Sequence, residues 1–331
     1  MPRNQGFVLA SRPTGVAVAD NFRFFEKDTP AIADGQVLVR HHYLSLDPYM
    51  RGRMDESKSY AASQQIDDVM IGGTVGEVVE SRHPKFAVGD KVVGMGGWQT
   101  YSVSDGVGLN KVMPGIPIQA FLGPVGMPGV TAWYGLNKII APKPGETVLV
   151  SAATGAVGSV VGQLAKAAGA RAVGIAGGAE KCRFAIDELG FDACVDHRSE
   201  TFAADFKAAL PNGIDGYFEN VGGKCFTLAS RRLNDFARVA ICGLIASYEG
   251  AETSSLDDLR ILLVKRAKIE GFIVSDHLPL WPQALGELAG AVATGKLKWR
   301  ETVADGIQAA PAAFFGMLRG KNFGKQLVKL I

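Results

Sequence analysis

The spacing of apolar and polar residues divides the chain into two regions of different character. In residues 1 to about 120, short β-type runs are separated by glycine and proline, as at Pro48, Gly72-Gly73 and Gly89-Asp90. Many short strands between turns are typical of a β-barrel or β-sandwich rather than of alternating strands and helices. We expect strands at residues 16–18, 36–41, 73–79, 91–95 and 100–103.

From about residue 121 the pattern changes to helices that alternate with strands. A helix is expected from Met127 to Leu136, with Pro128 in its first turn and Pro142 beyond its end. Such alternation predicts a parallel sheet with helices on both faces, which is a doubly wound, Rossmann-type α/β domain. The expected strands are residues 147–151, 172–176, 193–196, 214–219, 237–242 and 269–274, and the expected helices are 159–166, 180–189, 202–210 and 223–233.

The length of 331 residues also favours two domains, because one hydrophobic core rarely extends over so long a chain. After about Lys298 the sequence ends in Lys325-Gln-Leu-Val-Lys-Leu-Ile331, which predicts a short terminal strand. This strand could return to the first region and make it discontinuous, and periodicity alone leaves that question open.

A glycine-containing turn lies between the strand expected at residues 147–151 and the helix that follows. Its sequence, Ala153-Thr-Gly155-Ala-Val-Gly158, is A-x-G-x-x-G, with alanine in place of the first glycine of the dinucleotide fingerprint. Glycines here let the backbone approach a pyrophosphate, and the first amides of the helix can bind phosphate oxygens. The strand, turn and helix context favours a dinucleotide site over an ordinary turn.

The residues after the next expected strand indicate which dinucleotide is bound. NAD sites usually have an Asp or Glu about 20 residues after the glycines, where it binds the ribose hydroxyls. Residues 174–179 contain no acid, and Lys181 follows on the first turn of the next helix. A cation suits the 2′-phosphate of NADPH. The alternative, with Glu180 on the ribose and Lys181 in solvent, is less favoured because Glu180 lies past the end of the strand.

Composition limits the partners that we expect. The net charge is +2, with 47% apolar and 21% charged residues, so we expect a soluble enzyme and no nucleic-acid partner. The sequence has no leader-like start and no run of about 18 apolar residues, so no membrane association is expected. The four cysteines form no C-x-x-C pair, which argues against a disulfide scaffold and favours a reducing cytoplasm.

A catalytic metal is not expected either. Two-domain alcohol dehydrogenases often hold zinc with cysteine and histidine in the catalytic domain. Residues 1–181 contain no cysteine, and their histidines are His41, His42 and His83. His41 and His42 are neighbours in an expected strand, so their side chains point to opposite faces.

Five motifs in order along the chain carry a resemblance to a known family. They are residues 44–51 (LSLDPYMR), 125–132 (VGMPGVTA), 218–223 (FENVGG), 240–248 (AICGLIASY) and 321–325 (KNFGK). Over nearly its whole length the chain resembles the zinc-free medium-chain dehydrogenase/reductases. It is most similar to the branch with leukotriene B4 12-hydroxydehydrogenase/prostaglandin reductase, plant double-bond reductases and bacterial curcumin reductase.

This resemblance implies a domain organisation and an activity. Residues 1–120 and 298–331 would form a GroES-like β-barrel catalytic domain, and residues 121–297 would form the Rossmann NADPH-binding domain. The implied reaction is the NADPH-dependent reduction of the C=C bond of α,β-unsaturated ketones and aldehydes, and the implied assembly is a homodimer.

The resemblance also assigns residues to the cofactor. Lys181 matches the lysine of the 2′-phosphate site, whereas His197 stands where relatives often have a tyrosine, so its contact with the phosphate is a hypothesis. Read without the family, Asn220 is an ordinary residue of a turn at a strand end, and Cys242 and Phe272 are core residues. The implied contacts are Gly155, Ala156, Val157 and Gly158 (pyrophosphate); Lys181 and His197 (2′-phosphate); Asn220 (ribose); Cys242, Gly243, Tyr248, Phe272, Ile273 and Val274 (nicotinamide side); Met127 and Thr131 (under the nicotinamide); and Asn322 from the catalytic domain.

Reduction of an enone places negative charge on the carbonyl oxygen, so the site needs a hydrogen-bond donor there. A tyrosine hydroxyl can donate without being ionised. We expect Tyr248 to be this donor and Tyr49 to form a wall of the substrate site. Arg51 is expected to form a structural ion pair with Asp47. An NADPH quinone reductase and a non-catalytic, crystallin-like NADPH-binding protein are the alternatives.

Overall fold

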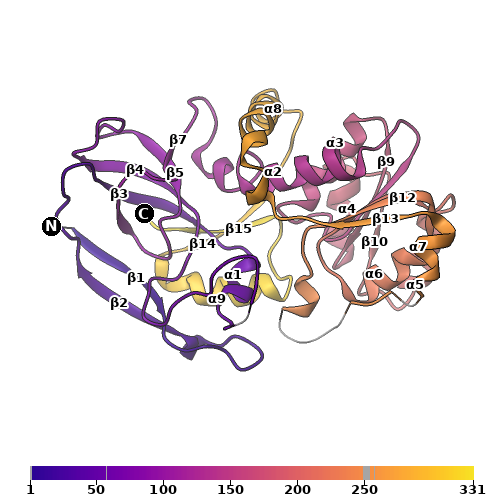
Figure 1. Ribbon diagram of the computed structural model, residues 1–331, viewed down its shortest axis with the longest axis horizontal. Coiled ribbons are helices and arrows are strands. Elements are labelled where there is room, and N and C mark those ends of the chain that lie inside the picture. The colour runs from indigo at the N-terminus through magenta and orange to yellow at the C-terminus, as the bar shows by residue number, and fades with distance from the viewer. Residues whose placement is uncertain (1, 57, 249–253, 257) are drawn as a thin grey trace. The chain divides into compact units, whose positions relative to one another are not determined.

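The computed structural model describes residues 2–56, 58–248, 254–256 and 258–331 (Figure 1). The chain forms two compact units. Unit 1 consists of Met1–Leu122 and Glu301–Ile331, and unit 2 consists of Gly123–Arg300. Unit 1 is rich in strands and unit 2 alternates strands and helices, which confirms the predicted α/β fold class.

Within its described residues, unit 1 has a seven-stranded sheet and a separate two-stranded hairpin. The terminal strand β15 pairs with β14 and with β3, so the end of the chain joins a sheet formed mainly by its beginning. The strands of the main sheet are β14 (Glu301–Asp305), β15 (Lys325–Lys329), β3 (Val37–Ser45), β4 (Thr74–Ser81), β5 (Lys91–Gly94) and β7 (Asn110–Lys111), in this order, with β6 (Tyr101–Ser104) on β3.

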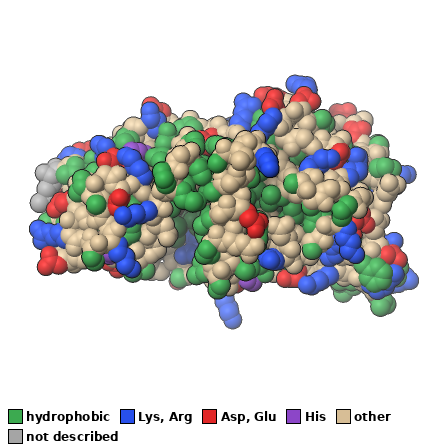
Figure 2. Space-filling view, turned by 90° about the horizontal axis from the view of Figure 1, so that it is seen from above, with side chains coloured by type: hydrophobic (Ala, Val, Ile, Leu, Met, Phe, Trp, Pro, Cys, Tyr) green, Lys and Arg blue, Asp and Glu red, His purple; other side chains and the backbone are tan. Residues whose placement is uncertain are grey.

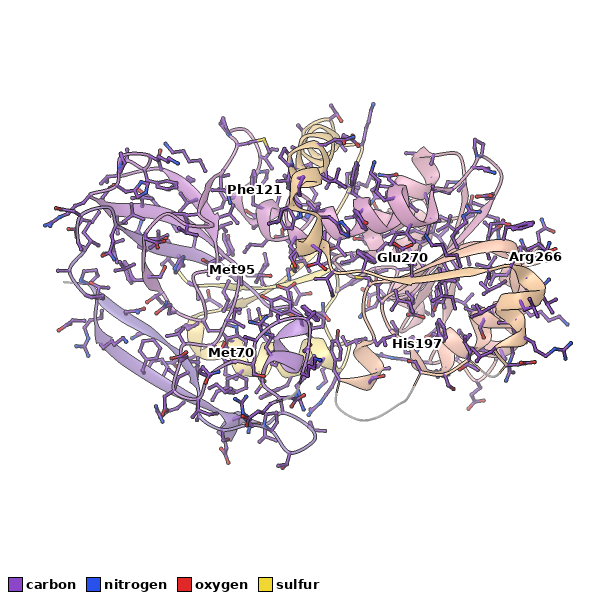
Figure 3. The ribbon with its side chains drawn as sticks, in the orientation of Figure 1. Met70, Met95, Phe121, His197, Arg266 and Glu270 are labelled. Atoms are coloured by element: carbon purple, nitrogen blue, oxygen red, sulfur yellow. The ribbon has the colours of Figure 1, made fainter. Side chains whose placement is uncertain are left out.

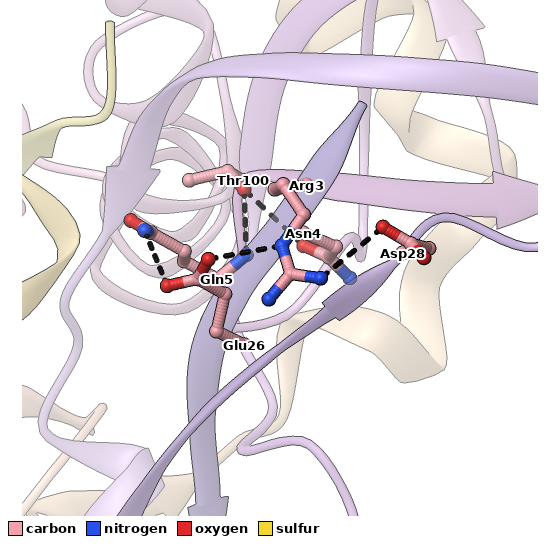
Figure 4. A network of polar contacts seen from close by, with 6 residues as sticks. All are labelled: Arg3, Asn4, Gln5, Glu26, Asp28 and Thr100. Carbon is pink, nitrogen blue, oxygen red and sulfur yellow. Dashed lines mark hydrogen bonds and ion pairs between the residues drawn. The ribbon is translucent and has the colours of Figure 1, made fainter. Parts of the chain in front are cut away.

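The hairpin of β1 (Arg3–Leu9) and β2 (Phe22–Asp28) was not predicted from the sequence. Most of β2 is exposed, so it lacks the alternation of buried and exposed residues that signals a strand. Apolar residues of both strands, namely Phe7, Leu9 and Phe22, are buried in the core of unit 1. Polar contacts add to this packing: Arg3 Nε donates to Glu26 at 2.9 Å, and the Gln5 amide donates to Thr100 Oγ1 at 3.0 Å (Figure 4).

The strand predicted at residues 16–18 is wrong. These residues form a bend that leads into a short 3-10 helix, Ala19–Asn21. Asn21 explains the bend, because its side-chain oxygen accepts the backbone N–H of Val18 at 2.8 Å. This local bond competes with strand pairing.

The core of unit 1 is built around Trp98, which is fully buried. The ring of Phe22 stacks on it at 5.1 Å, and Phe314 meets it edge to face at 5.5 Å. Phe314 belongs to helix α9 (Ala310–Leu318), so this core joins both ends of the chain. Met70, labelled in Figure 3, is another fully buried member of the same cluster.

The described part of unit 2 contains a six-stranded sheet in which every neighbouring pair is parallel. Numbered within the unit, the strand order is 3-2-1-4-5-6, which is the order of a Rossmann domain. In space the strands are β10 (Ala193–Asp196), β9 (Arg171–Ala176), β8 (Thr147–Val150), β11 (Ile214–Glu219), β12 (Leu233–Ile241) and β13 (Lys268–Gly271).

Helices cover both faces of this sheet, with α3 on one side and α5 and α6 on the other (Figure 1). The strands read as continuous apolar runs because both faces are buried, as in Val148-Leu149-Val150, where each residue is 0% exposed. On the side of α5 and α6, the core includes Phe202 and Phe206 of α5 and Phe226 of α6. The helices of the unit are α2 (Met127–Tyr134), α3 (Gly158–Ala167), α4 (Ala179–Asp187), α5 (Phe202–Ala209), α6 (Gly223–Ser230), α7 (Arg260–Lys265) and α8 (Trp281–Ala293).

Several predicted elements of unit 2 have different bounds in the structure: α2 ends at Tyr134 and a π-helix, Gly135–Ile140, follows it, and β12 begins at Leu233. The strand expected at residues 269–274 ends at Gly271, and a 3-10 segment, Val274–Leu280, follows it. The helix expected at residues 223–233 ends at Ser230, because Leu233 already begins β12. Apolar runs look alike in both kinds of element, so periodicity does not separate them at such a junction.

The face presented in Figure 2 shows no concentration of one charge. Basic and acidic side chains are interspersed among apolar ones on the face presented in Figure 2, in line with the net charge of +2. Within the described ranges, no helix combines the length and apolar character needed to cross a bilayer.

Candidate active site

The turn between β8 and α3 has the geometry of an anion site. A methyl group on Gly158 would lie 2.3 Å from the carbonyl oxygen of Ala152, so only glycine allows the helix to start this close to the turn. Among the described residues, the amides of Ala156, Val157 and Gly158 donate to no protein acceptor. With the positive end of the helix dipole, these N–H groups can bind a phosphate.

The ends of β8 and β11 are joined by hydrogen bonds that position Asn220. Its backbone N–H donates to Ser151 Oγ at 2.8 Å, and its side-chain amide donates to the Ser151 carbonyl at 2.8 Å. The amide nitrogen is therefore used within the protein, and the side-chain oxygen of Asn220 is the atom that remains for a ribose hydroxyl.

Glu219, which was not predicted from the sequence, accepts the hydrogen bonds that hold this junction together. It is 0% exposed, and one carboxylate oxygen accepts the Ser151 hydroxyl at 2.6 Å and the Gly222 amide at 3.0 Å. The hydroxyl of Tyr217 donates to the other oxygen. Burial, and then the Glu219 charge, raise the pKa of Tyr217 well above its usual value, so this phenol stays protonated. A glutamate inside an apolar strand is the only sequence signal of this role.

A group of basic side chains lies at the ends of β9 and β10. A methyl group on Gly177 would lie 2.9 Å from His197 Nε2 and 3.0 Å from Arg198 Nε, so both side chains cover this glycine. Lys224 Nζ donates to the His197 carbonyl at 2.8 Å. His197, labelled in Figure 3, has a lowered pKa because of burial, then the charges of Lys224 and Arg198.

Lys181 belongs to the same basic group. Its pKa is lowered by burial and then by the charge of Arg198, while Glu180 acts in the opposite direction. Burial is the larger cause of both shifts and the charge of Arg198 adds to each, so a bound phosphate would favour the protonated forms of Lys181 and His197. Arg198 was missed from the sequence, although it directly follows His197. The side chain of Glu180 is exposed, which favours Lys181 as a ligand of the 2′-phosphate over Glu180 as a ligand of the ribose.

A pocket of about 580 Å³ lies at the ends of β12 and β13. Its wall is mixed, with apolar side chains on one part and Glu270, Asp276 and His277 on another. Figure 3 labels Glu270, which sequence reasoning did not single out. Of the residues predicted for the nicotinamide side, the pocket lining includes Cys242, Gly243, Tyr248, Phe272 and Ile273.

Tyr248 ends the 3-10 turn Ile245–Ser247 on the rim of this pocket. A methyl group on Gly243 would lie 3.7 Å from the Tyr248 hydroxyl and 3.5 Å from the Asn220 carbonyl. The hydroxyl therefore lies over the loop that follows β12. Residues 249–253 come directly after Tyr248 and lie outside the described residues.

The interior of the pocket is apolar around Cys242 and Phe272. Burial raises the pKa of the Cys242 thiol to about 12, and the Glu219 charge adds to this effect, so the thiol is neutral. Phe272 is 9% exposed and packs edge to face on Phe218 at 6.1 Å. Val274 is also buried, but it is absent from the pocket lining and accepts the indole N–H of Trp281 at 3.1 Å.

Three other predicted residues have defined local roles. The hydroxyl of Thr131 donates to the carbonyl of Met127 at 2.8 Å within α2, so its lone pairs rather than its proton remain for a ligand. In unit 1, the side-chain amide of Asn322 donates to the Gly324 carbonyl at 2.8 Å, just before β15. Their contacts with a cofactor stay predictions.

Tyr49 is the first residue of the short helix α1 (Tyr49–Arg53) in unit 1. Met50 and Met54 are fully buried and anchor this helix in the core, which fixes the direction of Tyr49. Burial, and then the Asp47 charge, raise the pKa of the Tyr49 hydroxyl, so it is protonated over the physiological range. A neutral phenol suits a wall of the substrate site, and this role of Tyr49 stays a prediction.

The predicted ion pair between Arg51 and Asp47 is wrong. Asp47 pairs with Lys325 Nζ at 2.6 Å, in a site where both side chains are nearly buried. Arg51 pairs with Asp55 at 2.7 Å and donates to the Gly15 carbonyl at 2.6 Å. The partner of Asp47 comes from the terminal strand β15, which no local sequence pattern identifies.

The described residues contain no group of three or more His, Cys, Asp or Glu side chains that could hold a metal ion. His41 is buried on β3 and bonds through Nε2 to the Ser102 hydroxyl at 2.8 Å. Burial, with the neighbouring His42, lowers the pKa of His41 to about 3, so it is neutral and structural.

Comparison with known proteins places the chain in a family. Residues 5–112 match the N-terminal domain of oxidoreductases, and residues 156–290 match the zinc-binding dehydrogenase domain. The chain is 47% identical to the NADPH-dependent curcumin reductase of Escherichia coli, over 99% of this chain and 97% of that protein. It is 41% identical to the NADP(+)-dependent 2-alkenal reductase of Nicotiana tabacum, with 88% and 86% covered.

Other relatives agree with these. Prostaglandin reductase 1 of Bos taurus is 38% identical, over 99% of this chain and 100% of that protein. The crystal structure of CurA in complex with NADPH from Vibrio vulnificus matches with a TM-score of 0.94 and 46% identity, over 99% of each chain. The protein therefore belongs to the medium-chain dehydrogenase/reductase family, in the zinc-free branch of the curcumin, alkenal and prostaglandin reductases.

Proposed function

We propose that this protein is an NADPH-dependent reductase of the C=C bond of α,β-unsaturated ketones and aldehydes, and that it works without a metal. The observation that carries this proposal is the arrangement along one sheet. A phosphate-binding turn, a basic group and a pocket with a tyrosine on its rim follow one another along the ends of the parallel strands. Ligands of such sheets bind at these strand ends.

The residues present fit NADPH. The amides of residues 156–158 would hold the pyrophosphate, and the side-chain oxygen of Asn220 would accept a ribose hydroxyl. Lys181, His197 and Arg198 would surround the 2′-phosphate. The charges of Lys181 and Arg198 repel each other without an anion, and a phosphate between them would remove this repulsion.

The pocket at β12 and β13 supports reduction of an enone. Bound NADPH would supply a hydride to the β-carbon of the substrate, and a neutral phenol, with Tyr248 and Tyr49 the candidates, would supply the proton that the α-carbon takes up. Tyr248 then donates a hydrogen bond to the carbonyl oxygen, where negative charge develops. The apolar walls around Phe272 exclude water, so this hydrogen bond is stronger than in solvent. The assignment of Tyr49 to the substrate wall is part of the same proposal, and burial keeps its phenol neutral.

We also propose that the protein is a homodimer formed through β13. This strand is the outermost of its sheet, so its outer edge can pair with a second copy. Apolar side chains are exposed nearby on β12 and around α7, namely Phe236 (61%), Leu259 (71%) and Leu263 (77%). Arg266, labelled in Figure 3, covers the Phe236 ring at 4.5 Å. Sedimentation of the purified protein tests this assembly, and a monomer at micromolar concentration would refute it.

Substrate kinetics test the activity. We expect NADPH absorbance to fall with 2-alkenals and with curcumin-like dienones, and a chelator to leave the rate unchanged. Turnover of quinones without turnover of enones would replace the proposal with a quinone reductase. NADPH binding without turnover of either class would indicate a non-catalytic protein. Loss of activity with the chelator would refute the metal-independent mechanism.

A further inference from the structure

We propose that Cys182 and Cys194 form a reversible dithiol–disulfide pair, and that their oxidation weakens the binding of a dinucleotide that carries a 2′-phosphate. The coupling to the cofactor rests on the proposed use of NADPH. The pairing itself rests on the geometry of the two thiols alone.

The two sulfur atoms are already in contact. Cys182 lies in the first turns of α4 and Cys194 on β10, and their Sγ atoms are 3.1 Å apart. A disulfide needs a sulfur–sulfur distance of about 2.0 Å, so bond formation requires a movement of only about one ångström. Both are free thiols in the structure, as are the other two, Cys225 and Cys242.

The two thiols differ in a way that suits stepwise oxidation. The thiol of Cys194 donates its hydrogen bond to the sulfur of Cys182. This bond lowers the pKa of Cys182, and the position near the start of α4 also favours a thiolate there. For Cys194 the pKa is raised, first by the bond to Cys182 and then by burial. Cys182 is therefore the nucleophile and Cys194 the resolving thiol.

A hydroperoxide is the class of oxidant that completes the reaction. The Cys182 thiolate attacks the terminal oxygen of R–O–O–H, the O–O bond breaks, and the products are a sulfenic acid and the alcohol R–OH. The sulfur of Cys194 then attacks the Cys182 sulfur, and hydroxide leaves with the Cys194 proton as water. The two thiols lose two electrons, and these reduce the peroxide bond.

The pair lies directly beneath the cofactor site. Cys182 follows Lys181 in sequence, and Asp196 and His197 come two and three residues after Cys194. A methyl group on Gly174 would lie 3.1 Å from Cys194 Sγ and 2.7 Å from Ala153 Cβ, so this glycine alone separates the sulfur from the phosphate-binding turn. Drawing Cys182 toward β10 must move the first turn of α4, and Lys181 moves with it.

Peptide mapping tests the pair. Purified protein is treated with hydrogen peroxide and digested with a glutamate-specific protease, which releases Cys182 within residues 181–188 and Cys194 within residues 189–200. We expect a cross-linked peptide that has lost two hydrogen atoms and that dithiothreitol separates. Oxidation of the protein without this cross-link would overturn the pairing.

Direct binding tests the coupling. We expect oxidation to raise the dissociation constant of NADPH about tenfold, which corresponds to the loss of one charge-assisted hydrogen bond. The dissociation constant of NADH should not change. Dithiothreitol should restore the original value. Cys182→Ser and Cys194→Ser should each abolish the response to peroxide, while the control Cys225→Ala, a buried thiol on α6, should keep it.

Three results contradict the coupling. They are a fully cross-linked protein with unchanged NADPH affinity, equal weakening of NADH and NADPH, and a response to peroxide that persists in Cys194→Ser. If the reduced protein binds no NADPH at all, the proposed function fails and the coupling fails with it. The peptide map still decides on the pair in that case, so the two failures are distinguishable.

Discussion

Two sites along the sheet of unit 2 use different chemistry. The site at β8, β9 and β10 consists of backbone amides and basic side chains, which recognise phosphate groups. The pocket at β12 and β13 has apolar walls and one tyrosine hydroxyl near the loop after β12. The first site would serve any enzyme that uses NADPH, whatever its substrate. The second site must therefore determine which bond of the substrate is reduced.

This difference makes separable predictions. Changes at the phosphate site should act on cofactor affinity, with little effect on the chemical step. Changes in the pocket should act on the rate of the chemical step, with little effect on cofactor affinity. Each of the following experiments either supports this division or removes it.

Replacing Tyr248 by phenylalanine should have the largest effect. The variant loses the donor to the developing oxyanion, so we expect kcat for an enone to fall about 10²-fold while the KM for NADPH stays within about twofold. Stopped-flow measurement of NADPH oxidation checks this. The control is Tyr101→Phe, on β6 of unit 1, which should be unaffected. An unchanged kcat in Tyr248→Phe would leave the proton donor to another group, with Tyr49 the next candidate.

Replacing Gly158 by alanine should act next, and on the fold as well as on the cofactor. The added methyl group would lie 2.3 Å from the Ala152 carbonyl, so the turn and the start of α3 must move apart. We expect a loss of about 1–3 kcal/mol in the free energy of unfolding and weaker binding of NADH and NADPH alike. Gly290→Ala on α8, where the methyl group meets nothing within 4 Å, is the matched control. Full stability of Gly158→Ala in urea denaturation would contradict this geometry.

These two sites also differ in how far the sequence predicts them. The phosphate-binding turn is local in sequence, because its strand, its small residues and its helix follow one another within about twenty positions. A single sequence motif therefore contains all the elements of this site. Arg198 was missed although it adjoins His197, because only the structure shows both side chains over Gly177. Glu270 was missed because the sequence does not show that the end of the edge strand β13 lines the same pocket as Tyr248.

Unit 1 shows the same limit more strongly. The pair of Asp47 with Lys325 joins residues 278 positions apart, and a sequence interpretation chose the nearer cation, Arg51. The β1 and β2 hairpin was missed because most of β2 is exposed, so its residues show no alternation of buried and exposed positions. Contacts between distant segments are therefore the part of the fold that propensity and pattern do not determine.

Replacing Lys181 by alanine should have a moderate and selective effect. Loss of one charge-assisted contact predicts an increase of about tenfold in the KM for NADPH, with the KM for NADH and kcat unchanged. Steady-state kinetics with both cofactors measure this selectivity. Lys207→Ala, an exposed lysine on α5, is the control. Equal increases for both cofactors would mean that Lys181 supports the structure of α4 rather than the phosphate.

The smallest effect is expected from His197 and depends on pH. Its pKa in the free protein is lowered by burial, Lys224 and Arg198, so the ring is neutral at pH 7. A bound phosphate raises this pKa, so binding takes up a proton, and the affinity for NADPH relative to NADH should increase as pH falls through the pKa of the bound state. The variant His197→Phe keeps a planar ring but has no proton to gain, and should therefore lose this extra increase. Calorimetric titrations in two buffers of different ionisation enthalpy measure the proton uptake. If wild type and His197→Phe take up equal numbers of protons, His197 does not contact the phosphate, and selectivity for NADPH rests on Lys181 and Arg198.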